Sequence, residues 1–190
     1  MDIDGVLADF EAEFCERFFS GNRHLSNLHR RYPTIDKDII DEFVNTPETY
    51  ERLLPIFGGL LLLRQARALG FYILLMTSRP KYLAEVTRNW LDGYEVSYHE
   101  LQYAQNKATA IGEYNLMYPN CPIKVLVDDI IGNLENLPVG VAGVIWEQPW
   151  NTGYYPRATY DEQLMKIMVQ PNSVSVWKPF WENEDGLSNS

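Results

Sequence analysis

Hydrophobic residues along this chain gather in short unbroken runs, which polar and turn-forming residues separate. Three of these runs have the length of a strand and are rich in Val, Ile and Leu: Phe71–Met76, Lys124–Val127 and Val139–Trp146. Unbroken apolar runs of this length are typical of parallel strands that are covered on both faces. A further strand is predicted over Tyr94–Tyr98.

Helical patterns lie before and between these runs. Gly70 follows the first pattern and suits the position just after a helix end, and Pro80 suits the first turn of the second. Strands that alternate with helices predict an α/β fold, with a parallel sheet and helices on both of its faces. The predicted helices cover Leu60–Leu69, Lys81–Leu91, Ala108–Met117 and Ile130–Leu137.

Residues 11–56 differ from the rest of the chain, because they carry aromatic and charged residues at helical spacing and no clear strand. We therefore expect a small helical insert between two parts of one α/β core, residues 1–10 and 57–170. Residues 171–190 are polar and acidic near their end, and we expect part of this tail to be disordered.

The composition narrows the class of partner. Of 190 residues, 46% are hydrophobic and 13% aromatic, which is enough for a core, and the formal net charge is −10. Such an acidic chain lacks the basic face that binding a nucleic-acid polymer requires. A small phosphorylated substrate remains open, because a bound cation and a few basic side chains can set the local field.

The sequence predicts neither secretion nor a membrane span. The N-terminus is acidic, and the longest apolar stretch, Phe57–Leu63, is too short to cross a bilayer. Cys15 and Cys121 have the spacing of neither a disulfide framework nor a metal site, so each is expected to be a small buried residue. We expect a soluble, cytoplasmic protein.

Two aspartates open the chain. Asp2 and Asp4 are two positions apart, which in an extended segment puts both carboxylates on one side, and Gly5 permits a sharp turn after them. Two carboxylates that face one point need a cation, or one of them must take a proton. For such a pair alone, an acidic N-terminus that caps a helix is the alternative.

Polar groups also follow two of the predicted strands. Thr77 and Ser78 come directly after the first run, and Asp128 and Asp129 come directly after the second. Open α/β sheets bind ligands at the carboxyl ends of their strands, and buried carboxylates there need a partner or a metal such as magnesium. An ordinary helix N-cap is the alternative role for Ser78.

In order and spacing, these groups resemble the haloacid dehalogenase (HAD) superfamily of aspartyl phosphotransferases, and within it the 5'(3')-deoxyribonucleotidases. The resemblance covers roughly residues 1–150. It implies that Asp2 is the nucleophile, that Asp4 is the general acid and then the base, and that the Ile3 carbonyl is a metal ligand. The carboxylates implied at a Mg²⁺ site are Asp2, Asp4, Asp128 and Asp129.

The resemblance also implies how phosphate is bound. Thr77 is expected to hold phosphate oxygens, and Ser78 and Arg79 are expected to touch the substrate. Lys107, at the start of a helical pattern, is expected to neutralise the nucleophile and the transferring phosphoryl group. The alternative is that Lys107 is merely solvated. The competing lysines are Lys81 and Lys124.

In the resembled family the helical insert forms a cap over the strand ends. Its aromatic residues are therefore candidates to stack on a base, although most must form the core of the insert: Phe18, Phe19, Phe43 and Tyr50. The stretch Val144–Asn151, a strand that ends in a Gln-Pro-Trp-Asn string, resembles bacterial and phage members of the deoxyribonucleotidases. Asn151 and Arg157 are candidates to help close the site. For Trp146 and Trp150, packing at the edge of the last strand is the alternative. Asn133 either orients a water or ligand or is an exposed helix residue.

The chain departs from the family pattern at its start. Family members carry an apolar strand, the central one of the sheet, directly before the first aspartate, whereas only Met1 precedes Asp2. Loss of a central strand would leave backbone groups of both neighbours unpaired. Either the true start lies upstream, or an N-terminal piece is missing, or the sheet tolerates the loss.

The function expected from this reading is a magnesium-dependent phosphomonoesterase. Its substrate would be a (deoxy)ribonucleoside monophosphate, and its reaction would pass through an aspartyl-phosphate. The alternatives are a HAD phosphatase of another small phosphorylated metabolite and a non-catalytic HAD-like binding protein. A homodimer stays open, and we expect no nucleic-acid polymer and no membrane as partner.

Overall fold

Parallel strands form two small sheets in the computed structural model, which describes residues 1–19, 35–148, 151, 157 and 158. In the first sheet, Thr77 at the end of one strand pairs with Tyr103 at the end of the next. In the second, Asp128 pairs with Ile145. Within the described residues the strands are β1 (Leu74–Thr77) beside β2 (Glu100–Tyr103), and β3 (Val125–Asp128), β4 (Ala142–Trp146) and β5 (Arg157–Ala158) in that order.

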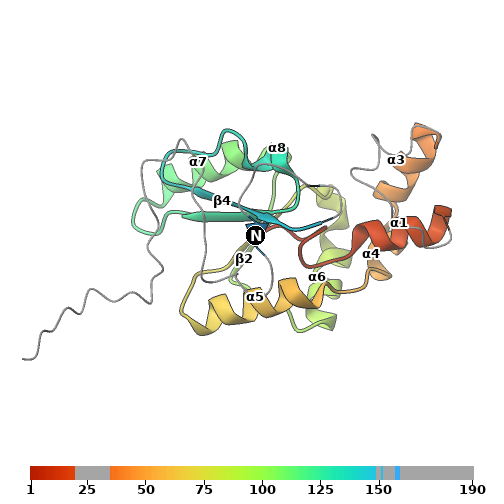
Figure 1. The fold of residues 1–190 in the computed structure, drawn as a ribbon, viewed down its shortest axis with the longest axis horizontal. Helices are drawn as coiled ribbons and strands as arrows, with labels where there is room; N and C mark the ends of the chain where they lie inside the picture. The colour runs from red at the N-terminus through yellow and green to blue at the C-terminus, as the bar shows by residue number, and fades with distance from the viewer. Residues whose placement is uncertain (20–34, 149–150, 152–156, 159–190) are drawn as a thin grey trace, which may run out of the picture.

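Helices cover both faces of these strands, as the sequence predicts. Figure 1 shows α7 and α8 above the strands and α5 and α6 below them. Together with the parallel pairing, this layering makes the core a mixed α/β structure. The helices of the core are α5 (Phe57–Ala68), the short 3₁₀ helix η1 (Lys81–Leu83), α6 (Ala84–Gly93), α7 (Lys107–Met117) and α8 (Ile131–Leu134).

The strands β1, β3 and β4 bury side chains against both helical layers, which explains their unbroken apolar runs. On β1, Leu75 belongs to the cluster that α5 and α6 complete, whereas Leu74 and Met76 belong to the cluster that α7 and α8 complete. On β3, Val127 and Leu126 divide between the two clusters in the same way. Alternate side chains of a strand point to opposite faces, so a strand between two layers needs apolar residues throughout.

The described residues between the first loop and α5, where the sequence predicts a helical insert, contain helices and no strand. Phe14 is fully buried and packs on Phe18 and Phe43, with ring centroids 4.8 and 5.2 Å away. The side chain of Asp36 caps α3 by accepting a hydrogen bond from the Asp38 N–H. The described helices of the insert are α1 (Phe10–Phe19), α3 (Lys37–Asn45) and α4 (Pro47–Glu51).

The predicted helices are present, with shifted ends. α5 begins at Phe57, before the predicted Leu60, and Gly70 follows it with a φ of 87°, as expected of a residue after a helix end. The predicted Ile130–Leu137 helix is only the single turn of α8. It stops early because Asn136 has a φ of 63° and Pro138 follows.

The predicted strand at Tyr94–Tyr98 is wrong. Tyr94 is instead the capping residue just after α6, which ends at Gly93, and Glu95 has a left-handed φ of 54°. The second strand is β2, further along the chain, whose side chains are only half-buried. Because β2 is the outer strand of its sheet, it needs no unbroken apolar run, and the pattern therefore missed it.

Two further sequence expectations concern burial. Cys15 is buried as expected, but Cys121 is exposed, in the turn before β3, which corrects the prediction for it. Within the described ranges, no helix has the length and apolarity that crossing a bilayer requires.

The first two residues connect the two sheets. The Met1 nitrogen donates to the Leu74 carbonyl at 2.9 Å, and the Met1 carbonyl accepts from the Met76 N–H at 2.9 Å. The Asp2 N–H donates to the Val127 carbonyl on the other side, also at 2.9 Å. Met1 and Asp2 therefore lie in a strand position between β1 and β3, and this position fixes the backbone of Asp2.

Candidate active site

Asp2 opens a tight loop at the carboxyl ends of β1 and β3. Its side chain is buried and accepts a hydrogen bond from the Ile3 N–H at 2.7 Å. Gly5 turns the chain with a φ of 78°, and a Cβ there would lie 2.3 Å from the carboxylate of Asp129. The expected turn glycine thus has a second role, because only glycine lets the loop approach Asp129 so closely.

The carbonyl of Ile3 is engaged within the loop. It accepts hydrogen bonds from the N–H groups of Leu7 at 2.7 Å and Ala8 at 2.9 Å. The metal role that the resemblance implies for this carbonyl therefore stays a prediction without geometric support.

Lys107 lies between two of the expected carboxylates. Its Nζ is 2.8 Å from Oδ1 of Asp2 and 2.6 Å from Oδ2 of Asp128. The residue begins α7, where the side chain of Asn106 caps the helix, and it is 2% exposed, which is rare for a lysine without a partner. The competing lysines, Lys81 and Lys124, are exposed. The structure thus places Lys107 at the site, while its catalytic role stays a prediction.

Three buried carboxylates gather beside this ammonium. Asp2, Asp128 and Asp129 each offer one oxygen, and these oxygens all lie within 4.8 Å of one another. Oδ1 of Asp128 is held by the Nδ2 of Asn133 at 3.0 Å and by the Ile130 N–H at 2.9 Å. Burial of so much negative charge is costly without compensation.

The donor set of this cluster fits a hard divalent cation. Magnesium prefers a few carboxylate oxygens and completes its shell with water and phosphate oxygens. Lys107 supplies one positive charge among the three aspartates, so a divalent ion would also improve the balance of charge. Asn133, whose role the sequence left open, acts here by orienting a candidate ligand, Asp128.

Burial governs the electrostatics of Asp2. It raises the pKa of this carboxyl from 3.8 to about 7, with Lys107 opposing the shift and Asp128 and Asp4 adding to it. Burial alone would lower the pKa of Lys107, but the charges of Asp2 and Asp128 outweigh it and raise that pKa. Burial also lowers the pKa of the Met1 amine to about 6. The pKa of Asp2 therefore lies near neutral pH, where the surroundings decide whether its carboxyl is charged.

Asp4 lies apart from the carboxylate cluster and pairs with Arg79. Arg79 Nη2 is 2.6 Å from Oδ1 of Asp4 and Nε is 2.8 Å from Oδ2. The same guanidinium donates to Thr87 and lies under the ring of Tyr50, 4.4 Å from the ring centroid. This guanidinium is therefore engaged by the protein itself. The metal role implied for Asp4 and the substrate contact implied for Arg79 stay predictions without geometric support.

The residues expected to bind phosphate lie at the end of β1. Thr77 is fully buried, and its Oγ1 accepts a hydrogen bond from the Arg79 N–H at 3.1 Å. Ser78 is exposed, and its carbonyl accepts from Gln105 at 2.6 Å. Both residues thus lie at the same edge of the strands as Asp128, which is the placement that the sequence predicted.

Some of the residues that support the site were predicted from the sequence, and others were not. Nε2 of Gln148 donates to the Gly5 carbonyl at 2.7 Å and so ties the loop after β4 to the Asp2 loop. The buried Asn151, which was a candidate, donates to the backbone carbonyls of Asp129 at 3.0 Å and Trp146 at 2.6 Å. Trp146 is buried in the core, as its packing alternative predicts. Trp150 lies outside the described residues, as does the side chain of Arg157.

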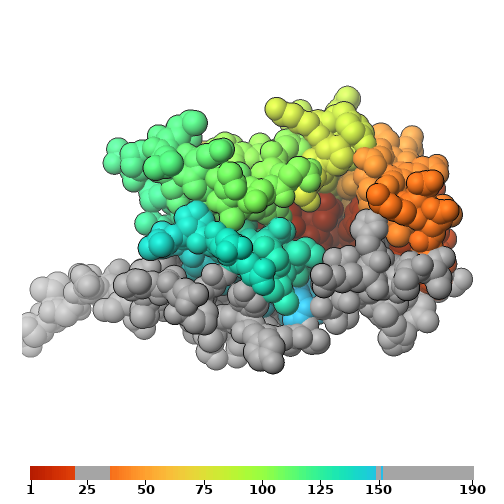
Figure 2. Space-filling model, turned by 90° about the horizontal axis from the view of Figure 1, so that it is seen from above, coloured from red at the N-terminus to blue at the C-terminus, as the bar shows by residue number. Residues whose placement is uncertain are grey.

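Most of the candidate aromatic residues of the insert form its core. Phe18 and Phe43 meet edge to face with ring centroids 5.6 Å apart, and Phe19 packs against the same cluster. Tyr50 differs, because its ring lies on Arg79 and therefore next to Asp4. Figure 2 shows a hollow in which the red, N-terminal part of the chain lies between the orange helices of the insert and the green and cyan core.

The site combines groups with complementary chemistry at one edge of the strands. Asp2 lies beside the ammonium of Lys107 and within a cluster that Asp128 and Asp129 complete. Asp4 lies across the loop and pairs with Arg79. No family model matches the chain. No curated protein matches it either.

Proposed function

We propose that this chain is a HAD-type, magnesium-dependent phosphomonoesterase that hydrolyses nucleoside monophosphates. One observation carries the proposal: a buried carboxylate, Asp2, lies 2.8 Å from the ammonium of Lys107 within the cluster completed by Asp128 and Asp129. A nucleophile, a counter-charge and a donor set for a cation thus meet at one point. A mixed α/β structure with parallel strands, and helices between the first loop and α5, support the proposal.

In this reaction Asp2 attacks the phosphorus atom in line with the ester oxygen. A bond forms between the carboxylate oxygen and phosphorus, and the bond to the ester oxygen breaks with its electron pair. Asp4 gives the leaving oxygen a proton and then accepts one from the water that hydrolyses the aspartyl-phosphate. Lys107 and Thr77 stabilise charge on the phosphoryl oxygens. Magnesium, when held by Asp2, Asp128 and Asp129, would offset the charge of the phosphate.

Arg79 is compatible with this role of Asp4. Its two hydrogen bonds take one lone pair on each carboxylate oxygen of Asp4 and leave the other lone pairs open. Asp4 is also 25% exposed at its side chain, whereas Arg79 is 1% exposed. The ion pair therefore fixes the orientation of the carboxylate while part of the Asp4 side chain stays exposed.

The nucleotide part of the proposal rests on the resemblance and on the insert. Tyr50 is the aromatic residue of the insert that reaches the Asp4–Arg79 pair, so it is our candidate to meet the substrate near the reacting phosphate. Another small phosphorylated metabolite would use the same chemistry. We also keep a cytoplasmic location as part of the proposal, since nucleoside monophosphates are found there.

The test is phosphate release from a panel of deoxy- and ribonucleoside monophosphates and sugar phosphates, with magnesium and with a chelator. We expect magnesium-dependent release from nucleotides, lost in Asp2→Asn. Asp92→Asn is the matched control, because it makes the same chemical change at an exposed position of α6. Full activity in Asp2→Asn would refute the assignment of the nucleophile. Release from sugar phosphates alone would move the substrate to another class.

A further inference from the structure

Side-chain amides after β4 reach two elements of the candidate site. Asn151 is 3% exposed, and its Nδ2 donates to the carbonyl of Asp129 at 3.0 Å and to the carbonyl of Trp146 at 2.6 Å. Its Oδ1 accepts from the Gln148 N–H at 3.0 Å. Nε2 of Gln148 donates in turn to the Gly5 carbonyl at 2.7 Å. Together these hydrogen bonds connect the backbone of Asp129 with the first loop of the chain.

The partners of Asn151 fix its residue type. Two carbonyl oxygens and one N–H surround its side chain, so the group between them must offer two donor hydrogens and an acceptor. An amide is the side-chain group that offers both from one plane. A leucine of nearly the same size would leave these backbone groups without the amide, which is costly where they are buried. Because the backbone engages both of its N–H hydrogens, Asn151 acts on the site through the main chain.

Asp129 lies where the pairing between two strands ends. β3 ends at Asp128, which pairs with Ile145 of β4, so Asp129 and Trp146 are the next opposite positions. The amide of Asn151 bridges the carbonyls of these two residues, where a ladder hydrogen bond would otherwise continue the sheet. The side chain of Asn151 thus holds the main chain of Asp129 just beyond the sheet.

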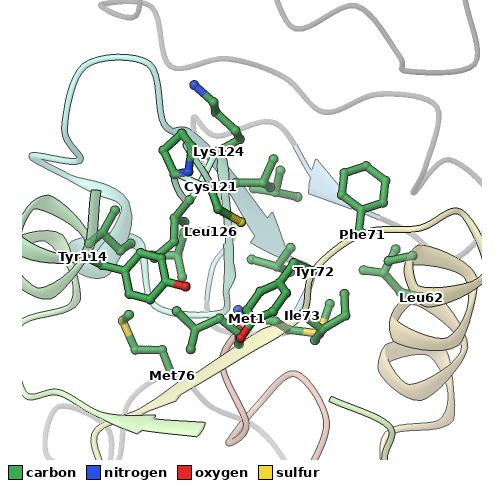
Figure 3. A pocket seen from close by; sticks show the side chains of 18 of the residues that line it. Met1, Leu62, Phe71, Tyr72, Ile73, Met76, Tyr114, Cys121, Lys124 and Leu126 are labelled. Carbon is green, nitrogen blue, oxygen red and sulfur yellow. Dashed lines mark hydrogen bonds between the residues drawn. The ribbon is translucent and has the colours of Figure 1, made fainter. Parts of the chain in front are cut away.

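Asp2 holds the opposite edge of β3. The Asp2 N–H donates to the Val127 carbonyl at 2.9 Å. Before this point the edge lines a cavity of about 420 Å³, where Figure 3 shows Leu62 and Tyr114 on opposite sides. Asp2 and Asn151 therefore hold the carboxyl end of β3 from its two edges, and the distance between Asp2 and the following carboxylates depends on both contacts.

The side chain of Asp129 depends on the other half of the same network. A Cβ at Gly5 would overlap the carboxylate of Asp129, so this carboxylate lies directly against the Gly5 backbone. The carbonyl of Gly5 is the group that Gln148 holds. Asn151 thus fixes the main chain of Asp129, and Gln148 fixes the backbone on which its carboxylate lies.

We propose that Gln148 and Asn151 form a clamp that positions the carboxylate of Asp129 for a divalent cation. This inference rests on the proposed function, because the cation is the one assigned there to Asp2, Asp128 and Asp129. Magnesium demands near-ideal octahedral geometry, so its carboxylate ligands must be held in place. Loss of groups that orient metal ligands typically weakens metal binding by about ten- to hundredfold. Both members of the clamp are positioning residues, since they act through Asp129.

The experiment measures magnesium binding by the full chain without substrate. Calorimetry gives the dissociation constant, and the rise in Tm at a fixed magnesium concentration is the second readout. Asn151→Leu removes one amide at nearly constant size, and Gln148→Met removes the other at nearly constant length. Asn115→Leu is the matched control, because the Asn115 amide likewise holds the backbone N–H and carbonyl of Ile123, but from the last turn of α7, at the other end from Lys107.

We expect the magnesium dissociation constant to rise about tenfold or more in Asn151→Leu, and by a smaller factor in Gln148→Met. The rise in Tm with magnesium should shrink in the same order. Asn115→Leu should lower the Tm in chelator and leave the dissociation constant unchanged. The comparison separates positioning from stability, because a merely structural role would lower the Tm in chelator without weakening magnesium binding.

An unchanged dissociation constant in both clamp variants would overturn the proposal, as would an equal loss in Asn115→Leu. If Asn151→Leu fails to fold, Gln148→Met decides, because its side chain is only half-buried: weaker binding supports the clamp, and unchanged binding overturns it. A wild type that binds magnesium but hydrolyses no phosphate ester would refute the proposed function and leave this comparison intact. A wild type that binds no magnesium would overturn both proposals.

Discussion

Arg79 holds the carboxylate of Asp4 with two hydrogen bonds, of 2.6 and 2.8 Å, across 75 positions of sequence. The guanidinium also contacts Thr87 of α6 and the ring of Tyr50 in α4. One buried side chain therefore connects the Asp2–Asp4 loop, the core and the insert. We therefore propose that Arg79 positions Asp4, the proposed acid and base, while the substrate contact that the resemblance implies for Arg79 stays a prediction.

Replacement of Arg79 by lysine should separate orientation from charge. Lysine keeps the positive charge but cannot form the two-bond pair, so we expect the turnover number to fall about tenfold or more while KM changes less. Loss of a well-packed, buried pair should also lower the free energy of unfolding by roughly 2 kcal/mol. Steady-state kinetics and denaturant unfolding measure the two effects.

The control for this variant is Arg88→Lys, which makes the same change at an exposed position of α6. It should leave both quantities unchanged. A normal turnover number in Arg79→Lys, with stability reduced, would show that Arg79 supports the fold and does not position Asp4.

We expect the loss of Lys107 to impair turnover more than the loss of another positive charge does. Lys107→Met removes the ammonium that lies 2.8 Å from Asp2 and 2.6 Å from Asp128, so we expect a loss of about a hundredfold or more in turnover. Lys81→Met tests the competing exposed lysine and should retain activity. The opposite result would move the catalytic lysine to Lys81.

Gly5 and Gly70 form a matched pair for a test of close approach. Both have positive φ, 78° and 87°, but a Cβ at Gly5 would meet the Asp129 carboxylate, whereas a Cβ at Gly70 would meet nothing within 4 Å. Each alanine variant should lose about 1 kcal/mol of stability through backbone strain. Only Gly5→Ala should also lose magnesium-dependent activity and magnesium-dependent stabilisation, measured as the shift in Tm on adding the ion. Equal behaviour of the two variants would mean that Asp129 is not a ligand.

The parts of the fold that the sequence predicted are those that local pattern encodes. The runs that became β1, β3 and β4 are apolar on both faces because each strand lies between two helical layers. Lys107, Thr77 and Asp128 were found because each stands at the end of such a run or at a helix start. Their placement at one edge follows from parallel strands that end there.

The rest depended on tertiary contacts that have no local signal. β2 lies at a sheet edge, and its mixed composition resembles that of a loop. The pairing of Arg79 with Asp4 and of Gln148 with Gly5 joins segments far apart in the chain. The loop also folds back so that Leu7 and Ala8 donate to the Ile3 carbonyl, which the residues alone do not reveal.

The titration of Asp2 should appear in the pH dependence of stability without metal. Its folded pKa, raised by burial to about 7, exceeds its usual value of 3.8, so the folded state binds a proton more tightly than the unfolded state does. The stability that Asp2 contributes is therefore complete below pH 3.8 and is lost as the pH rises to about 7. Asp2→Asn has no titrating carboxyl at this position. The Met1 amine, whose pKa is also shifted, is present in both proteins.

The measurement is the free energy of unfolding of both proteins in chelator, at about pH 5 and about pH 8, within and above that window. We expect the difference, wild type minus Asp2→Asn, to be smaller at the higher pH. Magnesium binds the ionised carboxylate, so its stabilising effect on the wild type should grow over the same interval and stay small in the variant. A difference that does not change with pH would mean that Asp2 is already ionised at the lower pH. The stabilising effect of magnesium would then not grow through Asp2 as the pH rises.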